Sequence, residues 1–192
     1  MVVVDNASRD GTAASARDAG ADVVRQPRLG YGWACLAGAR ASAGSDLIGF
    51  IDGDGSFYAA DLERLAAAVV RGEADLALGA RPAAMAQPAH QRAGNAAVLA
   101  ALRALYGLSL PDVAPLRVVR ADLLRELQMR GSRYAWLVEM LAKAARRRAR
   151  IAVLPVAYGR RRSGTSKVSG SVRGSLLAGL DFADALLRFR RW

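Results

Sequence analysis

Short apolar runs, each ending at a charged residue or a glycine, alternate with helical segments through the first part of the chain, and this alternation restricts the possible folds most. The predicted strands occupy residues 1–4, 22–25, 46–51 and 76–78, and the predicted helices between them occupy residues 11–19, 30–42 and 58–70. Strand and helix in regular alternation favour an α/β fold in which right-handed crossovers join parallel strands. The sequence therefore predicts a mostly parallel sheet flanked by helices.

The alternation loosens after Arg81. The later segments are predicted as a loop at 82–88, helices at 92–105, 121–129 and 136–148, a connector at 108–120, a strand at 151–158, and a Gly/Ser/Lys loop before a terminal helix. No repeat or linker divides the chain, so residues 1–175 are predicted to form one domain. The terminal segment, residues 176–192, is amphipathic and is expected either to pack on that domain or to lie on a membrane surface.

Cys35 and His90 are the only residues of their kinds in the chain, and their scarcity excludes several kinds of site. One cysteine cannot form an internal disulfide or a thiolate zinc cluster, and one histidine excludes mechanisms that need two imidazoles. No secretory signal pattern is visible, and no run approaches the ~20 apolar residues that span a bilayer. A cytoplasmic location is therefore expected.

The charge is distributed unevenly along the chain, whose formal net charge is +11. Residues 117–192 hold 18 basic and 5 acidic residues, a net of +13, whereas residues 1–116 hold 10 basic and 12 acidic residues, a net of −2. This asymmetry indicates an anionic partner, such as a nucleic acid, a phosphorylated substrate or an anionic membrane. A solvated basic surface produced by an Ala- and Arg-rich composition explains the excess equally well.

Two acidic clusters directly follow predicted strands. Asp5 follows the first strand, and Asp52 and Asp54 follow the third. Ligands of open parallel sheets bind beyond the carboxyl ends of the strands, and carboxylates gathered there commonly share a cation. Oxygen ligands suit Mg²⁺ or Mn²⁺, and Mg²⁺ commonly binds one or two carboxylates together with substrate phosphates. The segment Asp52-Gly53-Asp54 alone is also compatible with an ordinary turn.

Several blocks of sequence resemble family-2 glycosyltransferases, in the order in which that family has them. Residues 2–12 (VVVDNASRDGT) resemble the nucleotide-sugar motif, 30–44 the following helix, 50–54 (FIDGD) the metal-binding Asp-x-Asp strand end, and 78–81 (LGAR) the Gly-x-Arg segment. Three later blocks are similar to the dolichyl-phosphate-mannose-synthase-like branch: 111–117 (PDVAPLR), 134–140 (YAWLVEM) and 162–167 (RSGTSK). Each block is a weak signal by itself, but together they span most of the chain.

The resemblance implies a GT-A fold, which is a Rossmann-like sandwich with an Asp-x-Asp metal site. Asp5 and Asn6 are then expected at the nucleoside, and Asp52 and Asp54 at a Mg²⁺ or Mn²⁺ ion on the diphosphate, with Asp52 also contacting the nucleotide sugar. The sequence departs from the family at its beginning. The family's usual first strand, with the Pro/Asn/Glu loop that walls the nucleotide pocket, is absent ahead of residues 1–4.

The same resemblance assigns further contacts with the nucleotide sugar to later basic and polar residues, namely Arg81, Arg117, Arg162, Ser166 and Lys167. Glycosyl transfer develops negative charge on the departing diphosphate, and guanidinium groups stabilise such charge well. A solvated basic surface is the competing interpretation of Arg117, Arg162 and Lys167.

Asp112 and Glu139 are the predicted catalytic residues. Asp112 would take the proton of a hydroxyl acceptor, or would only position a phosphate acceptor, because such a phosphate is already ionised. A turn or capping aspartate is the competing interpretation. Glu139 lies in an apolar helix and needs a partner if it is buried. An ion pair with an arginine such as Arg117 is as compatible with the sequence as a catalytic role.

The function these features predict is an inverting glycosyltransferase. It would move a hexose from a nucleotide diphosphate sugar to a polyprenyl phosphate or similar acceptor, with peripheral contact at the inner face of the cell membrane. One alternative is a truncated, inactive glycosyltransferase-like remnant. The other is a basic nucleic-acid-binding protein, although the basic positions lack the interleaved aromatic residues that would stack on bases, so no nucleic-acid partner is expected.

Overall fold

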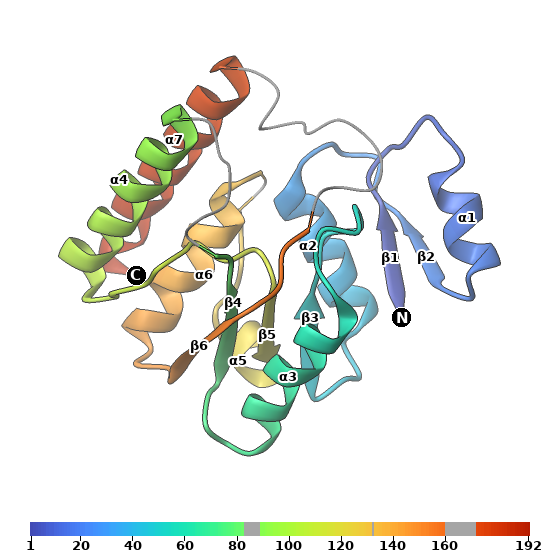
Figure 1. Cartoon of the computed structure of the whole chain (residues 1–192), viewed down its shortest axis with the longest axis horizontal. Coiled ribbons are helices and arrows are strands. Elements are labelled where there is room, and N and C mark those ends of the chain that lie inside the picture. Colours follow the sequence, from blue (N-terminus) through green and yellow to red (C-terminus); the bar gives the residue numbers. More distant parts are fainter. Residues whose placement is uncertain (83–88, 132, 160–171) are drawn as a thin grey trace.

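The computed structural model describes residues 1–82, 89–131, 133–159 and 172–192, in which six strands and seven α-helices follow one another along the chain (Figure 1). The strands are β1 (Val2–Asp5), β2 (Asp22–Arg25), β3 (Leu47–Phe50), β4 (Leu76–Ala80), β5 (Arg117–Arg120) and β6 (Ile151–Pro155). The helices are α1 (Thr12–Asp18), α2 (Tyr31–Ala41), α3 (Ala59–Val70), α4 (Ala89–Tyr106), α5 (Ala121–Glu126), α6 (Ala135–Arg146) and α7 (Val172–Arg188), and a short 3-10 turn (Phe189–Arg191) follows α7.

The predicted α/β class is confirmed, but the sheet is less parallel than the sequence predicts. The strand order is β3-β5-β4-β6, and β4–β6 is the one parallel pair of neighbours in this four-stranded sheet, because β5 runs antiparallel to both β3 and β4. The prediction of a connector over residues 108–120 is wrong at its end. There the two apolar residues of β5, Val118 and Val119, lie between charged residues and give too short a signal to indicate a buried strand.

The strands form two sheets instead of the single predicted sheet. β1 and β2 pair in parallel with each other, and among the described residues neither pairs with β3. Helix α2 links the two sheets, because it packs on β1 and β2 and also contacts α6. Gly38 lies at the contact with β1, where a Cβ atom would come within 3.2 Å of Val4.

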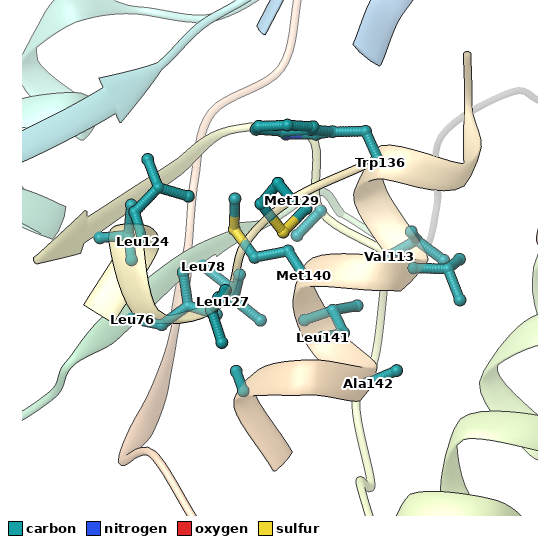
Figure 2. Close-up of a cluster of buried hydrophobic side chains, with 14 of the residues drawn as sticks. Leu76, Leu78, Val113, Leu124, Leu127, Met129, Trp136, Met140, Leu141 and Ala142 are labelled. Atoms are coloured by element: carbon teal, nitrogen blue, oxygen red, sulfur yellow. The ribbon is translucent and has the colours of Figure 1, made fainter. Parts of the chain in front are cut away.

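Alternate residues of the four-stranded sheet enter two separate cores. Leu76 and Leu78 point toward α6 and pack with Trp136 and Met140, as Figure 2 shows. Ala77 joins the opposite core, which forms against α3. Burial of Leu76 and Leu78 is complete, so each contributes about 2 kcal/mol of transfer free energy. The sheet is thus packed on both faces.

Helix α7 lies against α4 and α6 (Figure 1). It begins at Val172, ahead of the predicted segment 176–192. Ala185, Leu186 and Phe189 are buried in the core, whereas Leu180 and Leu187 are 59% and 68% exposed. The terminal segment therefore packs on the domain with one face and leaves apolar side chains on the other.

Candidate functional site

The carboxyl ends of β1, β3 and β4 point to the same side of the molecule, at the top of Figure 1. Asp5 ends β1, Asp52 and Asp54 follow β3, and Arg81 directly follows β4. The sequence explains these positions. Each strand is a run of β-branched or apolar residues, and the run ends at or next to a charged residue because burying a further charged side chain in the core would be unfavourable. One edge of the two sheets thus carries the predicted donor-site residues of three segments.

The start of β5 brings the 112–117 segment to the same edge. Arg117, the first residue of β5, pairs in the ladders with Phe50 of β3 and with Leu78 of β4. Its electrostatic partners include both Asp52 and Asp112. The segment that precedes β5 therefore lies between the ends of β3 and β4.

Asp5 is buried, with only 3% of its surface exposed. Its Oδ1 accepts a hydrogen bond from the backbone N–H of Ser8 (3.0 Å), and its Oδ2 lies 3.9 Å from Nε of Arg25. Hydrogen bonds from the Ser8 side chain and backbone, followed by the charge of Arg25, hold the pKa of Asp5 below its usual value. A pocket of about 140 Å³ adjoins this carboxylate and is lined by Asp5, Ala7, Arg25, Gln26 and Pro27.

Asn6 joins the end of β1 to the start of α2. Its Nδ2 donates to the carbonyl oxygens of Gln26 (3.0 Å) and Arg28 (2.7 Å), and its Oδ1 accepts from the N–H of Gly30 (2.9 Å). Gly30 has a φ of 144°, a conformation that favours glycine. The Asn6 side chain thus fixes the loop that closes one side of the Asp5 pocket, and its predicted contact with a nucleoside stays a prediction.

The Asp52-Gly53-Asp54 turn leads from β3 toward α3. Oδ1 of Asp54 accepts from both the backbone N–H (2.9 Å) and the hydroxyl (2.5 Å) of Ser56, which is fully buried. This Asx turn orients the carboxylate. Groups of three or more His, Cys, Asp or Glu side chains that could hold a metal by themselves are absent from the described part of the chain. A cation bound by Asp52 and Asp54 would take further oxygen ligands, such as substrate phosphates or water.

Arg81 and Asp112 form the best-defined ion pair of the edge. Arg81 donates from Nε to Oδ2 and from Nη2 to Oδ1, both at 2.8 Å, and its backbone N–H lies 3.3 Å from Oδ2. Burial would raise the pKa of Asp112, but these bonds outweigh it and hold the pKa below the usual value. The guanidinium also lies 5.6 Å from the ring of Tyr158. The pair is thus fixed in position and charged at neutral pH.

Arg117 is fully buried and donates to backbone carbonyl groups. Its Nη2 reaches Val113 (2.8 Å) and Ala114 (2.5 Å), Nε reaches Ala114 (3.1 Å), and Nη1 reaches Leu137 (3.2 Å). Ala114 has a φ of 50°, so this unusual backbone is held by the guanidinium. Instead of presenting its charge at the surface, Arg117 shapes the loop that carries Asp112.

Glu139 is also fully buried, but its partner is Lys143 and not the arginine that the sequence suggested. Their N–O distance is 2.7 Å, across one turn of α6. The carboxylate also accepts from the backbone N–H groups of Arg130 (2.8 Å) and Gly131. All of these bonds point into the protein, so the geometry gives no support to direct contact between Glu139 and a substrate.

The remaining predicted site residues, Arg162, Ser166 and Lys167, lie outside the described residues. Sequence reasoning missed Ser56, Tyr158 and Lys143. The spacing of Ser56 from Asp54 is typical of an Asx turn, and the i,i+4 spacing of Glu139 and Lys143 is typical of a helical ion pair. Tyr158 gave no signal, because its contact with Arg81 depends on the parallel pairing of β4 with β6.

A larger cavity of about 560 Å³ lies elsewhere. It opens between α2, β3 and α5, and its wall includes Leu36, Ile48, Leu124, Met129 and Trp136. None of the predicted site residues that the structure describes lines this cavity. The described residues of the carboxyl edge are therefore separate from this larger cavity.

Acidic strand ends, an Asp-x-Asp turn and a bidentate Arg–Asp pair lie at the carboxyl edge of an α/β sheet, and the fold is of the GT-A type. The model of the family Glycosyl transferase family 2 matches residues 1–126. The chain belongs to this family and is a family-2 glycosyltransferase.

Relatives and solved structures agree with this assignment. An uncharacterized glycosyltransferase of Mycobacterium tuberculosis is 43% identical over 183 residues, which cover 94% of this chain and 83% of the relative. An undecaprenyl-phosphate mannosyltransferase of Micrococcus luteus is 32% identical over 208 aligned positions, covering 100% of this chain and 81% of the relative. The crystal structure of glucosyl-3-phosphoglycerate synthase from Mycobacterium tuberculosis with Mn²⁺ and UDP-glucose superposes with a TM-score of 0.78 at 20% identity, over 98% of this chain and 67% of that chain. At this identity the superposition shows the fold.

Among the helices that the structure describes, none combines the length and the apolar composition that crossing a membrane requires.

Proposed function

We propose that this glycosyltransferase transfers a hexose, with inversion, from a nucleoside diphosphate sugar to a polyprenyl phosphate. The observation that carries the proposal is the joint placement of the Asp52-Gly53-Asp54 turn and the Arg81–Asp112 pair at one sheet edge, on either side of the start of β5. The first group suits a metal-bound diphosphate, and the second suits an anionic acceptor beside it.

The donor side fits a divalent cation. Asp52 and Asp54 offer carboxylate oxygens, and Mg²⁺ or Mn²⁺ commonly binds one or two such groups together with substrate phosphates. When bound, the ion would neutralise negative charge on the departing diphosphate. Asp5, with its low pKa, stays ionised at neutral pH and would accept hydrogen bonds from nucleoside N–H or hydroxyl groups. Arg162, Ser166 and Lys167 are proposed to contact the donor from the basic loop.

The low pKa of Asp112 supports a phosphate as the acceptor. A carboxylate with a lowered pKa is a weak base, and the Arg81 guanidinium already donates to both of its oxygens. A phosphate monoester needs no base, because its second pKa is about 6. Asp112 would therefore orient Arg81 toward the acceptor phosphate. To act as a general base instead, Asp112 would first have to lose its hydrogen bonds with Arg81.

The transfer itself is a displacement at the anomeric carbon. An oxygen of the acceptor phosphate attacks from the face opposite the diphosphate, and the bond between the anomeric carbon and the diphosphate oxygen breaks. The electron pair leaves with the nucleoside diphosphate, so no proton transfer is needed. Arg81, which the sequence assigned to the nucleotide sugar, is proposed instead to orient the attacking phosphate, and Arg117 would hold the 113–114 backbone on which Asp112 depends.

The relative from Micrococcus luteus supports a lipid phosphate, since its name states undecaprenyl phosphate. Crystal structures of glucosyl-3-phosphoglycerate synthase contain phosphoglyceric acid, which is a phosphorylated acceptor of another kind. The basic second part of the chain and the exposed Leu180 and Leu187 of α7 favour the lipid, because both features suit a peripheral position on an anionic membrane, which we place at the inner face of the cell membrane.

A direct assay tests the proposal. The purified chain is incubated with a panel of nucleotide sugars, Mn²⁺ or Mg²⁺, and one of three acceptors: a short polyprenyl phosphate, the corresponding polyprenol, or 3-phosphoglycerate. We expect product with the polyprenyl phosphate and none with the polyprenol. Product with 3-phosphoglycerate alone would overturn the lipid acceptor, and product with the polyprenol would restore Asp112 as a general base.

A further inference from the structure

We propose that the buried Glu139–Lys143 pair is a positioning device for the donor site, which it controls through the loop between α5 and α6 and the first turn of α2. The inference rests on the proposed function, in that it names residues that shape the nucleotide pocket without contacting the nucleotide. Four contacts in series carry it.

The first contact is the pair itself. Glu139 and Lys143 are both fully buried, and 2.7 Å separates the carboxylate oxygen from Nζ. Burying two charges is costly even when they pair, and apolar residues of similar size often stabilise a core as well or better. A buried ion pair at this place is therefore better explained by the geometry it imposes than by the stability it adds.

The second contact is a brace on the loop at 127–131. Lys143 Nζ donates to the carbonyl oxygens of Leu127 (2.8 Å) and Gln128 (2.9 Å), and Glu139 accepts from the N–H groups of Arg130 (2.8 Å) and Gly131. Lys143 thus binds two carbonyl acceptors of the loop, and Glu139 binds two of its N–H donors. Gln128 has a φ of 44°, so the loop holds a conformation that non-glycine residues seldom adopt.

The third contact joins this loop to α2. The N–H of Gly32 donates to the carbonyl of Arg133 (3.0 Å). A Cβ atom on Gly32 would lie 2.0 Å from the carbonyl oxygen of Gly131, so the two backbones touch directly. A Cβ atom on Gly131 would in turn lie 2.7 Å from Oε2 of Glu139. Any shift of the Glu139 carboxylate therefore reaches the first turn of α2 through backbone atoms.

The fourth contact joins α2 to the donor site. Gly30 precedes α2 and binds Asn6, the residue after Asp5. Tyr31, the first residue of the helix, is influenced by the other acidic cluster. Burial raises the pKa of Tyr31, and the charges of Cys35 and then Asp52 raise it further. The first turn of α2 is thus connected to both acidic clusters of the proposed donor site.

The C-terminal turn covers the pair from the other side. Lys143 Nζ lies 4.5 Å from the ring centroid of Phe189 and 4.9 Å from that of Trp192. These rings exclude water from the ammonium group and favour its charge through cation–π attraction. The pair is therefore enclosed between the braced loop and the chain end, and its geometry is defined on both sides.

The test uses the double variant Glu139→Gln/Lys143→Met, which removes both charges and leaves neither one unpaired in the core. The control is Asp75→Asn, which breaks an ion-pair cluster at the start of β4. Nucleoside diphosphate binding is measured by calorimetry with Mn²⁺, and amide hydrogen exchange is followed over residues 30–34 and 127–131. We expect the double variant to weaken binding about tenfold or more, to raise the donor KM more than it changes kcat, and to speed exchange in both segments. The control should leave binding and these exchange rates unchanged.

The proposed function and the positioning role of the Glu139–Lys143 pair can fail separately in this experiment. If the wild-type chain binds no nucleoside diphosphate, the proposed function is wrong, and faster exchange over 30–34 in the double variant still supports the positioning role. If the wild-type chain binds and the folded double variant binds equally well with unchanged exchange over 30–34, the inference is overturned. Should the double variant fail to fold, Gly32→Ala takes its place, because it disturbs the same backbone contact from the α2 side and is expected to weaken binding likewise. Unchanged binding by folded Gly32→Ala would also overturn the inference.

Discussion

The guanidinium of Arg81 holds the carboxylate of Asp112 by two hydrogen bonds of 2.8 Å each, one from Nε and one from Nη2. The two residues come from different segments, the end of β4 and the loop before β5, so the pair also ties those segments together. Both side chains are largely buried, with 20% and 6% of their surfaces exposed. Their charges are therefore screened little by solvent, and the pair sets the local electrostatics of the proposed acceptor side.

Asp112→Asn should lower kcat/KM for the acceptor by about 100-fold, because the amide cannot hold the guanidinium in the same orientation. Arg81→Lys should have a similar effect, since an ammonium group cannot make the two-point contact. Steady-state kinetics with the acceptor varied at saturating donor measure both. An increase in the donor KM as large as the loss of kcat/KM for the acceptor would contradict the assignment of this pair to the acceptor.

The rate should also show no ionisation of Asp112 between about pH 5 and 8. The pKa of this carboxyl lies below its ordinary value of 3.8, so the group is fully ionised throughout that range. A pH profile of kcat at saturating substrates checks this. A limb with an apparent pKa near 6 that disappears in Asp112→Asn would show that Asp112 acts as a base.

Asp54→Asn should abolish metal-dependent transfer and leave the fold intact. The asparagine Oδ1 can still accept the two hydrogen bonds from Ser56, so the turn should persist, but the charge that would bind Mn²⁺ is lost. Turnover measured over a Mn²⁺ titration, with thermal unfolding as the control for folding, tests the prediction. Unchanged turnover of the nucleotide sugar would refute the metal assignment.

The elements next to the donor side could be predicted from sequence because their signals are local. The prediction placed β2 at the residues the structure gives, and the ends of β1 and β3 within one or two residues, because each apolar run stops where Asp5 or Asp52 begins. The acidic residues are thus part of the same signal that marks the strands. Their placement at one edge followed from the general rule for α/β sheets.

The acceptor side could not be predicted in the same way, because it depends on contacts between distant segments. Strand β5 is short, and it becomes a strand only through pairing with β3 and β4 on its two sides. The burial of Arg117 follows from that pairing and not from its neighbours in sequence. Glu139 could have been paired with Lys143 from the helical spacing alone, but the loop that both residues brace is visible only in the structure.

Cys35 should resist alkylation in the folded protein. Its side chain is 9% exposed, and burial raises the pKa of the thiol to about 12, so almost no reactive thiolate forms. Iodoacetamide at about pH 8, followed by mass spectrometry, should label the chain only after denaturation. Ser45→Cys, which adds a thiol at an exposed position, is the matched control and should be labelled in the native state. Rapid labelling of native Cys35 would show that α2 does not stay packed on the core.

Asp75 should make the stability of the domain depend on pH in the acid range. Its carboxylate accepts from the N–H (2.9 Å), Nε (3.1 Å) and Nη2 (2.8 Å) of Arg150, and from Nη1 of Arg120 (3.3 Å). These bonds tie the start of β4 to β6 and to the end of β5. The hydrogen bonds of Arg150 are the largest cause that lowers the pKa of Asp75, from 3.8 to about 2.

A lowered pKa in the folded state stabilises the fold above the unfolded pKa, and that stabilisation is lost as the pH falls through the folded pKa. The contribution of Asp75 should therefore be complete above about pH 5 and should disappear between about pH 4 and 2. We expect Asp75→Asn to lower the free energy of unfolding by about 1 kcal/mol at pH 7, because the partly exposed arginines are screened by solvent. Urea unfolding of both proteins at a series of pH values should show the difference shrinking toward pH 2.

Asp184→Asn is the control for that experiment, since its ion pair with Arg188 is about two-thirds exposed on both sides and should contribute little. Its unfolding curve should follow the wild type at every pH. A constant difference between Asp75→Asn and wild type down to pH 2 would mean that the asparagine disturbs the backbone at the start of β4 and that the charge of Asp75 is not the cause. Such a result would also disqualify Asp75→Asn as the control for the Glu139–Lys143 test, and Asp184→Asn would then serve in its place.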